Sequence, residues 1–155
     1  MKRTYTLATA VLACLASAAS VAAAQGSTPT ARAARAATVN LRSTSMGRIL
    51  VNASGFTLYE FTRDHGDRDS CMGISGCARS WPALETSGRP NAGAGVRASL
   101  LSTIRLPGGA SQVTYAGHPL YRYSEDSAPG DTEYVGANAF GGNWNAINAS
   151  GHAVR

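Results

Sequence analysis

GRILVNASGFTLYEFTRD, residues 47–64, has a second copy further along the chain. The stretch GASQVTYAGHPLYRYSED, residues 109–126, aligns with it without a gap. After one inserted residue the similarity continues, and Trp81–Leu84 aligns with Trp144–Ile147. Self-similarity of this length indicates an internal duplication, with copies over about 47–84 and 109–147. The identical pairs are Gly47/Gly109, Val51/Val113, Gly55/Gly117, Leu58/Leu120, Tyr59/Tyr121 and Asp64/Asp126.

Each copy reads as β-structure. A shared pattern, in which small residues and a glycine separate two runs rich in β-forming residues, occurs at 53–58, 115–120 and 149–154. It predicts three hairpin turns. The third is a partial copy over 147–155. We therefore predict an all-β, two-repeat antiparallel domain of hairpins, sandwich- or barrel-like. The expected strands are 49–51, 57–61, 103–106, 111–115, 120–123 and 144–147, with short helices at 77–81 and 98–101.

Alternation assigns the faces of the strand that leaves each turn. Tyr59 and Phe61 share one face, opposite Leu58 and Glu60. Tyr121 and Tyr123 share the matching face in the second copy. We expect these aromatic pairs, together with the repeated Trp81 and Trp144, to be structural residues buried where the repeats meet.

The first 38 residues read as targeting and linker sequence. Lys2 and Arg3, a weakly apolar stretch and Ala22–Ala24 are typical of a secretory signal over 1–24. Cys14 loosely fits a lipidation site, but the apolar region continues past it, so soluble export is favoured over lipid anchoring. Residues 25–38 lack bulky side chains and predict a flexible tether. The folded domain is then 39–155.

The net charge belongs mainly to that leading segment. The chain carries 14 Lys+Arg against 9 Asp+Glu, a formal charge of +5. Without Lys2, Arg3, Arg32 and Arg35, 10 basic residues face 9 acidic ones, which leaves +1 on the folded part. No stretch interleaves arginine with aromatic residues in the manner of a nucleic-acid-binding groove, so a nucleic-acid partner is excluded. With 44% hydrophobic and 15% charged residues and 3 cysteines, the composition also excludes a coiled coil and a disulfide-dense miniprotein.

Cys71 and Cys77 enclose five residues. In an exported protein such a pair predicts a structural disulfide, because the spacing differs from that of a two-residue redox motif. The alternative is a soft-metal site for copper. It would draw on His65, Cys71, Met72 and Cys77, with Met46 or His118 nearby.

Acidic loops follow the aromatic strand in both copies. Asp64, Asp67 and Asp69 follow the first strand, and Asp126, Asp131 and Glu133 follow the second. Their oxygens are weak candidates for Ca²⁺ ligands. The alternative, which we favour, is that the aspartates order the turns by accepting backbone N–H groups.

No motif frames a catalytic group. Ser, His and Asp all occur, but no nucleophile elbow surrounds a serine, so no catalytic residue is assigned. A carbohydrate-binding surface would need the motif aromatics to be exposed. We expect no cofactor, no membrane span in the mature chain and no enzymatic activity.

The motif residues resemble a bacterial family. Residues 59–64, YEFTRD, and 121–126, YRYSED, fit the Y-x-[FWY]-x-x-D pattern of secreted repeats of unknown function, also described as predicted lipoproteins. Residues 71–82, 112–121 and 140–144 are similar to it as well, so that the resemblance covers about 47–151. The cysteine spacer is longer here than in many members, and the lipidation site is poor. The family brings no catalytic residues.

Together these features predict an exported envelope or extracellular protein. We expect a monomeric, non-catalytic binding or structural module whose partner or ligand the sequence does not identify. The runner-up hypothesis is a metal-linked role, with Ca²⁺ in the acidic loops or copper and redox handling.

Overall fold

The structure is a computed structural model that describes residues 35–66 and 68–155. The predicted signal segment, Cys14 and the tether up to residue 34 lie outside the described residues. Strand β1 (Thr38–Thr44) already includes Thr38, and the Ala37 N–H donates to Thr86 Oγ1 at 2.9 Å. The ordered fold therefore begins before the predicted boundary at residue 39. Within the described ranges, no helix has the length and apolar character needed to cross a membrane.

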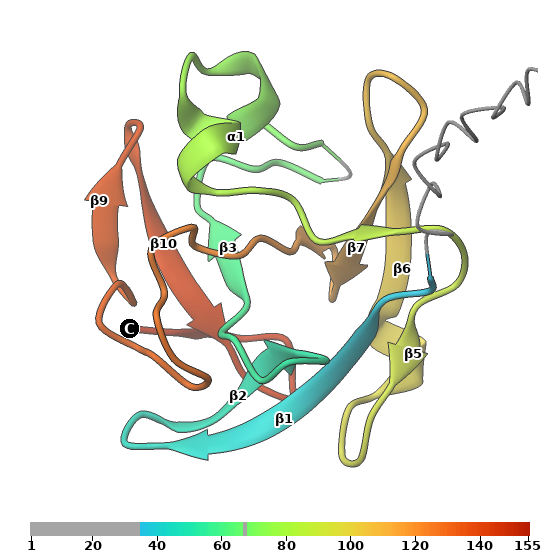
Figure 1. The fold of residues 1–155 in the computed structure, drawn as a ribbon, viewed down its shortest axis with the longest axis vertical. Helices are drawn as coiled ribbons and strands as arrows, with labels where there is room; N and C mark the ends of the chain where they lie inside the picture. Colours follow the sequence, from blue (N-terminus) through green and yellow to red (C-terminus); the bar gives the residue numbers. More distant parts are fainter. Residues whose placement is uncertain (1–34, 67) are drawn as a thin grey trace, which may run out of the picture. The chain divides into compact units, whose positions relative to one another are not determined.

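The fold is all-β, as predicted, and its strands form three small sheets (Figure 1). One sheet has the order β2-β1-β5, the second β11-β10-β3 with β9 on β10, and the third β4-β7-β6 with β8 on β7. The strands after β1 are β2 (Gly47–Asn52), β3 (Tyr59–Phe61), β4 (Glu85–Thr86), β5 (Asn91–Ala92), β6 (Leu101–Arg105), β7 (Ser111–Tyr115), β8 (His118–Pro119), β9 (Ala137–Ala139), β10 (Gly142–Ile147) and β11 (Ala153–Val154). The two expected helices are present as α1 (Cys77–Ser80) and the 3₁₀ turn η2 (Ala98–Leu100), and a further 3₁₀ turn, η1, spans Cys71–Gly73.

All three predicted hairpin turns are present. In the first and third, Asn52 and Asn148 act alike, because each side-chain oxygen accepts two backbone N–H groups of its own turn. The middle turn is tighter and joins β7 to β8 through Ala116 and Gly117, whose φ angles are 51° and 84°. Two consecutive positive φ values are typical of a two-residue hairpin loop, and glycine adopts them without steric cost.

The prediction of a regular strand over 120–123 is wrong. Only Tyr121 makes bridges, one to Tyr59 and one to Ala83. The segment that lies beside it is residues 80–83, which begins where helix α1 ends. Because Pro82 in this segment has no N–H to donate, no continuous ladder of hydrogen bonds forms.

The core consists of two clusters on either side of the motif strands. Leu58 and Leu120 belong to an aliphatic cluster, whereas Tyr59, Phe61 and Tyr121 belong to an aromatic one. Both faces of β3 are therefore buried, whereas in the second copy Arg122 lies exposed on the face that Leu120 shares. The sequence analysis placed Glu60 opposite the aromatic face, and that face is also covered, which leaves Glu60 only 6% exposed.

Candidate functional site

A local pseudo-twofold axis relates the two repeats and passes between Tyr59 and Tyr121. Each of these tyrosines donates its backbone N–H to the carbonyl of the other, both at 3.0 Å. Further out, the Thr62 N–H donates to Asn143 O and the Ser124 N–H donates to Ser80 O. These are equivalent positions in the two copies. Each motif strand therefore pairs with the tryptophan segment of the other repeat rather than with its own.

The aromatic residues of the repeats form one column. Phe61 stacks on Trp144 with ring centroids 4.1 Å apart, and Trp144 stacks on Trp81 at 4.0 Å. Tyr123 lies on the other side of Trp81 at 4.3 Å. Tyr59 and Tyr121 meet Trp81 and Trp144 edge to face, both at 5.1 Å. The aromatic side chain at the third motif position thus stacks on the tryptophan of the opposite repeat.

The motif aspartates also bond to the opposite repeat. The Tyr121 hydroxyl donates to Asp64 Oδ2 at 2.8 Å, and the Tyr59 hydroxyl lies 3.2 Å from both oxygens of Asp126. Burial raises the pKa of Asp64 and of Asp126 to about 6, and it also raises the pKa of both tyrosines. The first and last residues of Y-x-[FWY]-x-x-D therefore act across the repeat junction.

The other acidic candidates serve their own loops or point outward. Asp69 accepts the Met72 N–H at 2.9 Å. Asp131 accepts the N–H groups of Ser127 and Ala128, which lower its pKa. Glu133 is exposed, and Asp67 lies outside the described residues. In the described part of the chain, no three His, Cys, Asp or Glu side chains gather closely enough to hold a metal ion.

Cys71 and Cys77 form a disulfide, with an S–S distance of 1.98 Å. Both cysteines are buried in the aromatic cluster. The soft-metal site that used their thiolates is therefore wrong, because the sulfur atoms are bonded to each other.

The motif aromatics do not form a carbohydrate platform. Tyr59, Phe61 and Tyr121 are at most 1% exposed, and Tyr123 is half-buried against Trp81 and Tyr134. A sugar has no access to the buried rings.

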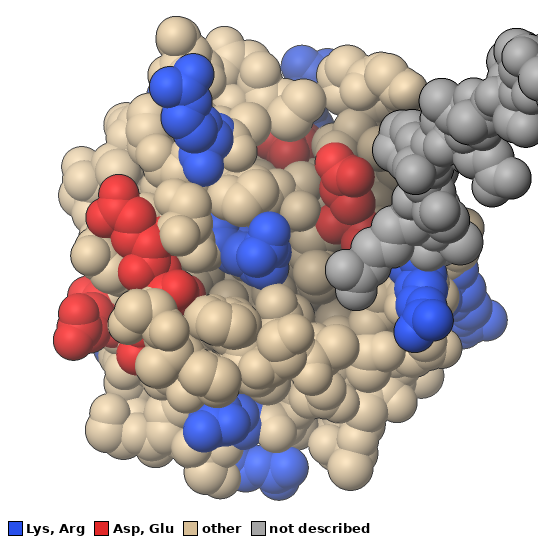
Figure 2. Space-filling view, in the orientation of Figure 1, with Lys and Arg blue, Asp and Glu red and all other residues tan. Residues whose placement is uncertain are grey.

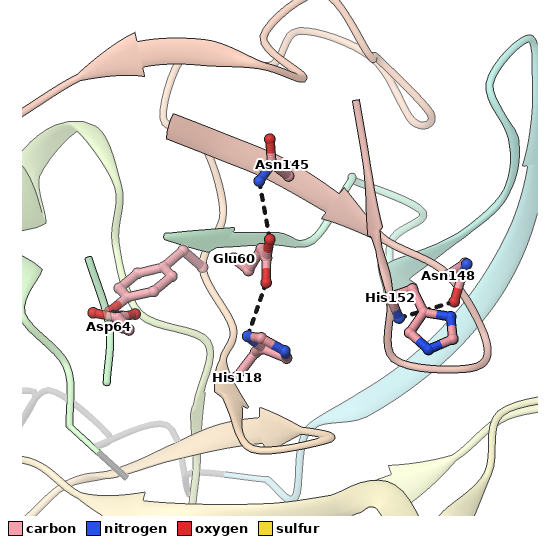
Figure 3. Close-up of polar contacts among 7 residues, drawn as sticks. Glu60, Asp64, His118, Asn145, Asn148 and His152 are labelled. Atoms are coloured by element: carbon pink, nitrogen blue, oxygen red, sulfur yellow. Dashed lines mark hydrogen bonds and ion pairs between the residues drawn. The ribbon is translucent and has the colours of Figure 1, made fainter. Parts of the chain in front are cut away.

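A polar group lies beside this junction (Figure 3), and of its members the sequence analysis named only His118 as a candidate. Glu60, from β3, accepts the Asn145 Nδ2–H at 2.9 Å and the His118 Nδ1–H at 2.8 Å. The Glu60 side chain is 7% exposed and that of His118 is 41% exposed. Burial alone would raise the pKa of Glu60, but the bonds from His118 and Asn145 outweigh it and hold that pKa below its usual range.

The duplication provides a comparison for this group. Glu60 is equivalent to Arg122, His118 to Phe56, and Asn145 to Pro82. Arg122 is exposed, and the Pro82 side chain cannot donate a hydrogen bond. The same scaffold therefore stands on the other side of the junction without a buried acid, an imidazole or an amide.

One sequence signal was available for this site. The two copies differ in charge at Glu60/Arg122 and again at Arg63/Glu125, and Glu60 is the buried residue among these four. That difference marks a position where the repeats have separate roles. The contact with Asn145 depends on pairing between repeats and has no signature within either copy.

Charged side chains are dispersed over the surface. On the face shown in Figure 2, basic side chains lie apart from one another, one near the centre and others toward the edge, and acidic side chains lie between them.

Comparison with known proteins places the whole duplicated region in one family model. Residues 41–85 and residues 102–148 each match the model described as a secreted repeat of unknown function. These two matches cover more than half of the chain and coincide with the two structural repeats. Neither a curated protein nor a solved structure matches the chain.

Proposed function

The chain belongs to this family of secreted repeats of unknown function, and from that premise we propose that it is a non-catalytic binding module of the extracytoplasmic space. One observation carries the proposal. The polar residues of the repeated motif are engaged with each other across the junction, Tyr121 with Asp64 and Tyr59 with Asp126. Half-buried carboxyl groups bonded to tyrosine hydroxyls in this way serve to join the two repeats, which favours a structural role for the motif.

Export is supported by several features. The family is described as secreted, and Cys71 and Cys77 are joined by a disulfide, which persists in oxidising compartments. The signal-like residues 1–24 agree with this. We place the mature protein in soluble form outside the cytoplasm, because apolar sequence continues past Cys14 where a lipidation site should end it.

The proposed module is a monomer with one binding partner outside the cytoplasm. Each repeat satisfies the motif strand of the other within one chain, so the aromatic column needs no second subunit. This leaves the surface groups that differ between the repeats as the places to look for a ligand.

The proposal is tested by comparing turnover with stability. The purified, disulfide-bonded protein and its Asp64→Asn and Asp126→Asn variants are assayed against panels of ester, glycoside, phosphate and peptide substrates. We expect no turnover by any of the three proteins, and the unfolding midpoints establish that the variants are folded. Turnover by the wild type that either variant abolishes would contradict a non-catalytic role.

A further inference from the structure

Strand β6 has one edge without a partner strand among the described residues. It stands at the end of the sheet β4-β7-β6, so that β7 alone pairs with it (Figure 1). The Leu106 N–H donates to Ala110 O at 2.8 Å. Because bonded and non-bonded residue pairs alternate along an antiparallel ladder, Thr103 and Arg105 direct their N–H and C=O groups away from β7. These four groups have no hydrogen-bond partner within the described ranges.

The first repeat shows that this position in the fold accepts an added strand. β1 pairs with β2 as β6 pairs with β7, so β1 and β6 are equivalent strands. On its outer edge β1 receives β5 in parallel, with Thr38 opposite Asn91. The Gly93 N–H then donates to Val39 O at 2.8 Å. In the part of the chain that the structure describes, the second repeat has no strand in the place of β5.

The residues of β6 leave the edge unprotected. Natural sheets commonly block a free edge with a proline, a bulge or a charged side chain within the strand. The register with β7 is continuous from Leu101 to Arg105, so no bulge interrupts β6. Arg105 stands at the end of the strand, and its guanidinium donates to Gly109 O at 2.8 Å. An open edge of this kind can take up an extended peptide as an additional strand.

A hollow of about 400 Å³ lies against this edge, between Leu101–Thr103 and Arg89–Pro90. The side chains of consecutive strand residues point to opposite faces of a sheet. A hollow that three consecutive residues line therefore follows the edge of β6 and not one of its faces. Leu101 and Pro90 are buried apolar residues in this lining, whereas Ser102 and Thr103 are exposed. The space suits an extended chain that carries an apolar side chain.

The charge of this region indicates which kind of peptide it suits. Residues 86–124 contain Arg89, Arg97, Arg105 and Arg122, and no lysine, aspartate or glutamate. Arg89 lines the hollow, and Arg97 precedes the turn η2, which leads into β6. Both side chains are exposed. Opposite charges across an interface favour encounter and suppress wrong partners, so the edge favours an acidic peptide.

The same charges disfavour an occupant from this protein itself. Two copies joined through their β6 edges would bring like charges together, which costs free energy. Residues 1–34, which precede the described part, carry Lys2, Arg3 and Arg32 and no acidic residue. An acidic segment of another protein is therefore the occupant that fits.

We propose that β6 binds an extended, acidic peptide segment of a partner protein by strand addition. The peptide exchanges main-chain hydrogen bonds with Thr103 and Arg105. It places an apolar side chain in the hollow beside Leu101 and directs carboxylates toward Arg89 and Arg97. Main-chain bonds give affinity in this mode of recognition, and the hollow gives selectivity. This inference rests on the proposed binding function and names its partner class.

The test is an NMR titration of the disulfide-bonded, full-length protein with a synthetic peptide of alternating glutamate and valine residues, blocked at both ends. We expect one peptide per chain, with the largest shifts at the amides of Thr103 and Arg105. Hydrogen exchange of these two amides should be fast in the free protein and slow in the complex. The same peptide methylated at its backbone nitrogens keeps its charges but donates no main-chain bond. It should bind about 10-fold more weakly or worse.

Matched variants separate main-chain pairing from attraction by charge. Thr103→Pro removes an outward N–H at an edge position, where proline is tolerated, and should weaken binding about 3–10-fold. Thr103→Val keeps that N–H and should bind as the wild type does. Arg89→Gln should weaken binding about two- to fivefold, whereas Arg48→Gln, on β2 of the first repeat, should not. Circular dichroism and the unfolding midpoint establish that each variant is folded.

Three results would overturn the inference. One is equal binding of the parent and the methylated peptide, which would mean attraction by charge alone. Another is slow exchange at Thr103 and Arg105 in the free protein. If that exchange is slow at every protein concentration, the chain's own leading residues fill the edge, and if it is slow only at high concentration, a second copy does. The third is the absence of peptide binding. None of these results bears on the non-catalytic proposal, which is decided by turnover.

Discussion

The loops that follow the motif in the two repeats hold the same aromatic column by different means. In the first repeat, a disulfide between Cys71 and Cys77 closes the loop, which contains η1 and leads into α1. The second repeat has no cysteine. There Asp131 binds two backbone N–H groups of its own loop, and Tyr134 packs on Tyr123 at 4.0 Å. Both loops deliver a tryptophan to the column, so the column is the shared requirement and the loops have been free to diverge.

Removing a tryptophan should have the largest effect and should not discriminate between the repeats. Trp144→Ala and Trp81→Ala each remove an inner ring of the column. We expect each to lower the free energy of unfolding by about 3–5 kcal/mol, as large-to-small changes of buried aromatics do. Urea unfolding followed by circular dichroism measures both. Losses that differ by more than about 2 kcal/mol would show that the two halves of the column are not equivalent.

Removing the disulfide should affect the first loop only. Closing so short a loop contributes about 2 kcal/mol in the chain-entropy model. The double variant Cys71→Ala/Cys77→Ala should lose this amount and should show faster hydrogen exchange over residues 68–80. Asp131→Ala serves as the comparison, with faster exchange confined to the second loop. If exchange rises equally in both loops of the disulfide variant, the loops are coupled and not independent.

The two tyrosine–aspartate bonds offer a finer comparison. Tyr121→Phe removes the 2.8 Å bond to Asp64, and Tyr59→Phe removes the 3.2 Å contacts with Asp126. We expect a loss of about 1–2 kcal/mol for Tyr121→Phe and a smaller one for Tyr59→Phe, since shorter bonds to carboxylates are stronger. The double variant should lose roughly the sum of the two. Thermal unfolding of all three variants gives the values, and the reverse order would contradict this account.

Acid should stabilise the junction slightly. The pKa values of Asp64 and Asp126 are raised to about 6 in the folded protein from ordinary values near 3.8. Between pH 4 and 6 the folded state therefore binds more protons than the unfolded state, and the free energy of unfolding falls as the pH rises. For carboxylates that are partly screened by solvent we expect about 1 kcal/mol each.

Unfolding curves at half-unit steps of pH test this expectation. The decline should flatten in Asp64→Asn and in Asp126→Asn, and it should flatten further in the double variant. A wild-type stability that rises from pH 4 to 6 would contradict the assignment.

The alignment of the two copies predicted much of the secondary structure of the domain. It located both repeats and the hairpin turns, because glycines and β-rich runs at matching positions identify local structure. It could not reveal which partner each strand takes, since pairing within a repeat and pairing between repeats preserve the same offset. Strand β1 was missed because it precedes the aligned stretch, although β6 takes the same place in the second copy, where it pairs with β7 as β1 pairs with β2.

The polar group at Glu60 was missed for a related reason. Alternation assigned Glu60 to the face opposite the aromatics, and that assignment is correct for β3 alone. Burial of this face depends on β10 and β8, which belong to the other repeat. Local sequence therefore predicted the environment of Tyr59 better than that of Glu60, whose contacts are all more than 50 residues away.

The exchange of hydrogen bonds between Tyr59 and Tyr121 has a consequence for how such chains can grow. Because each motif strand is completed by the opposite copy, the two motif strands are matched within the pair. A further full copy would have no motif strand left to pair with, in contrast to solenoids, where every added repeat extends the stack. The partial copy over 147–155 adds only the two-residue strand β11 to β10. Chains built on this plan should therefore lengthen by whole pairs, and their repeats should occur in even numbers.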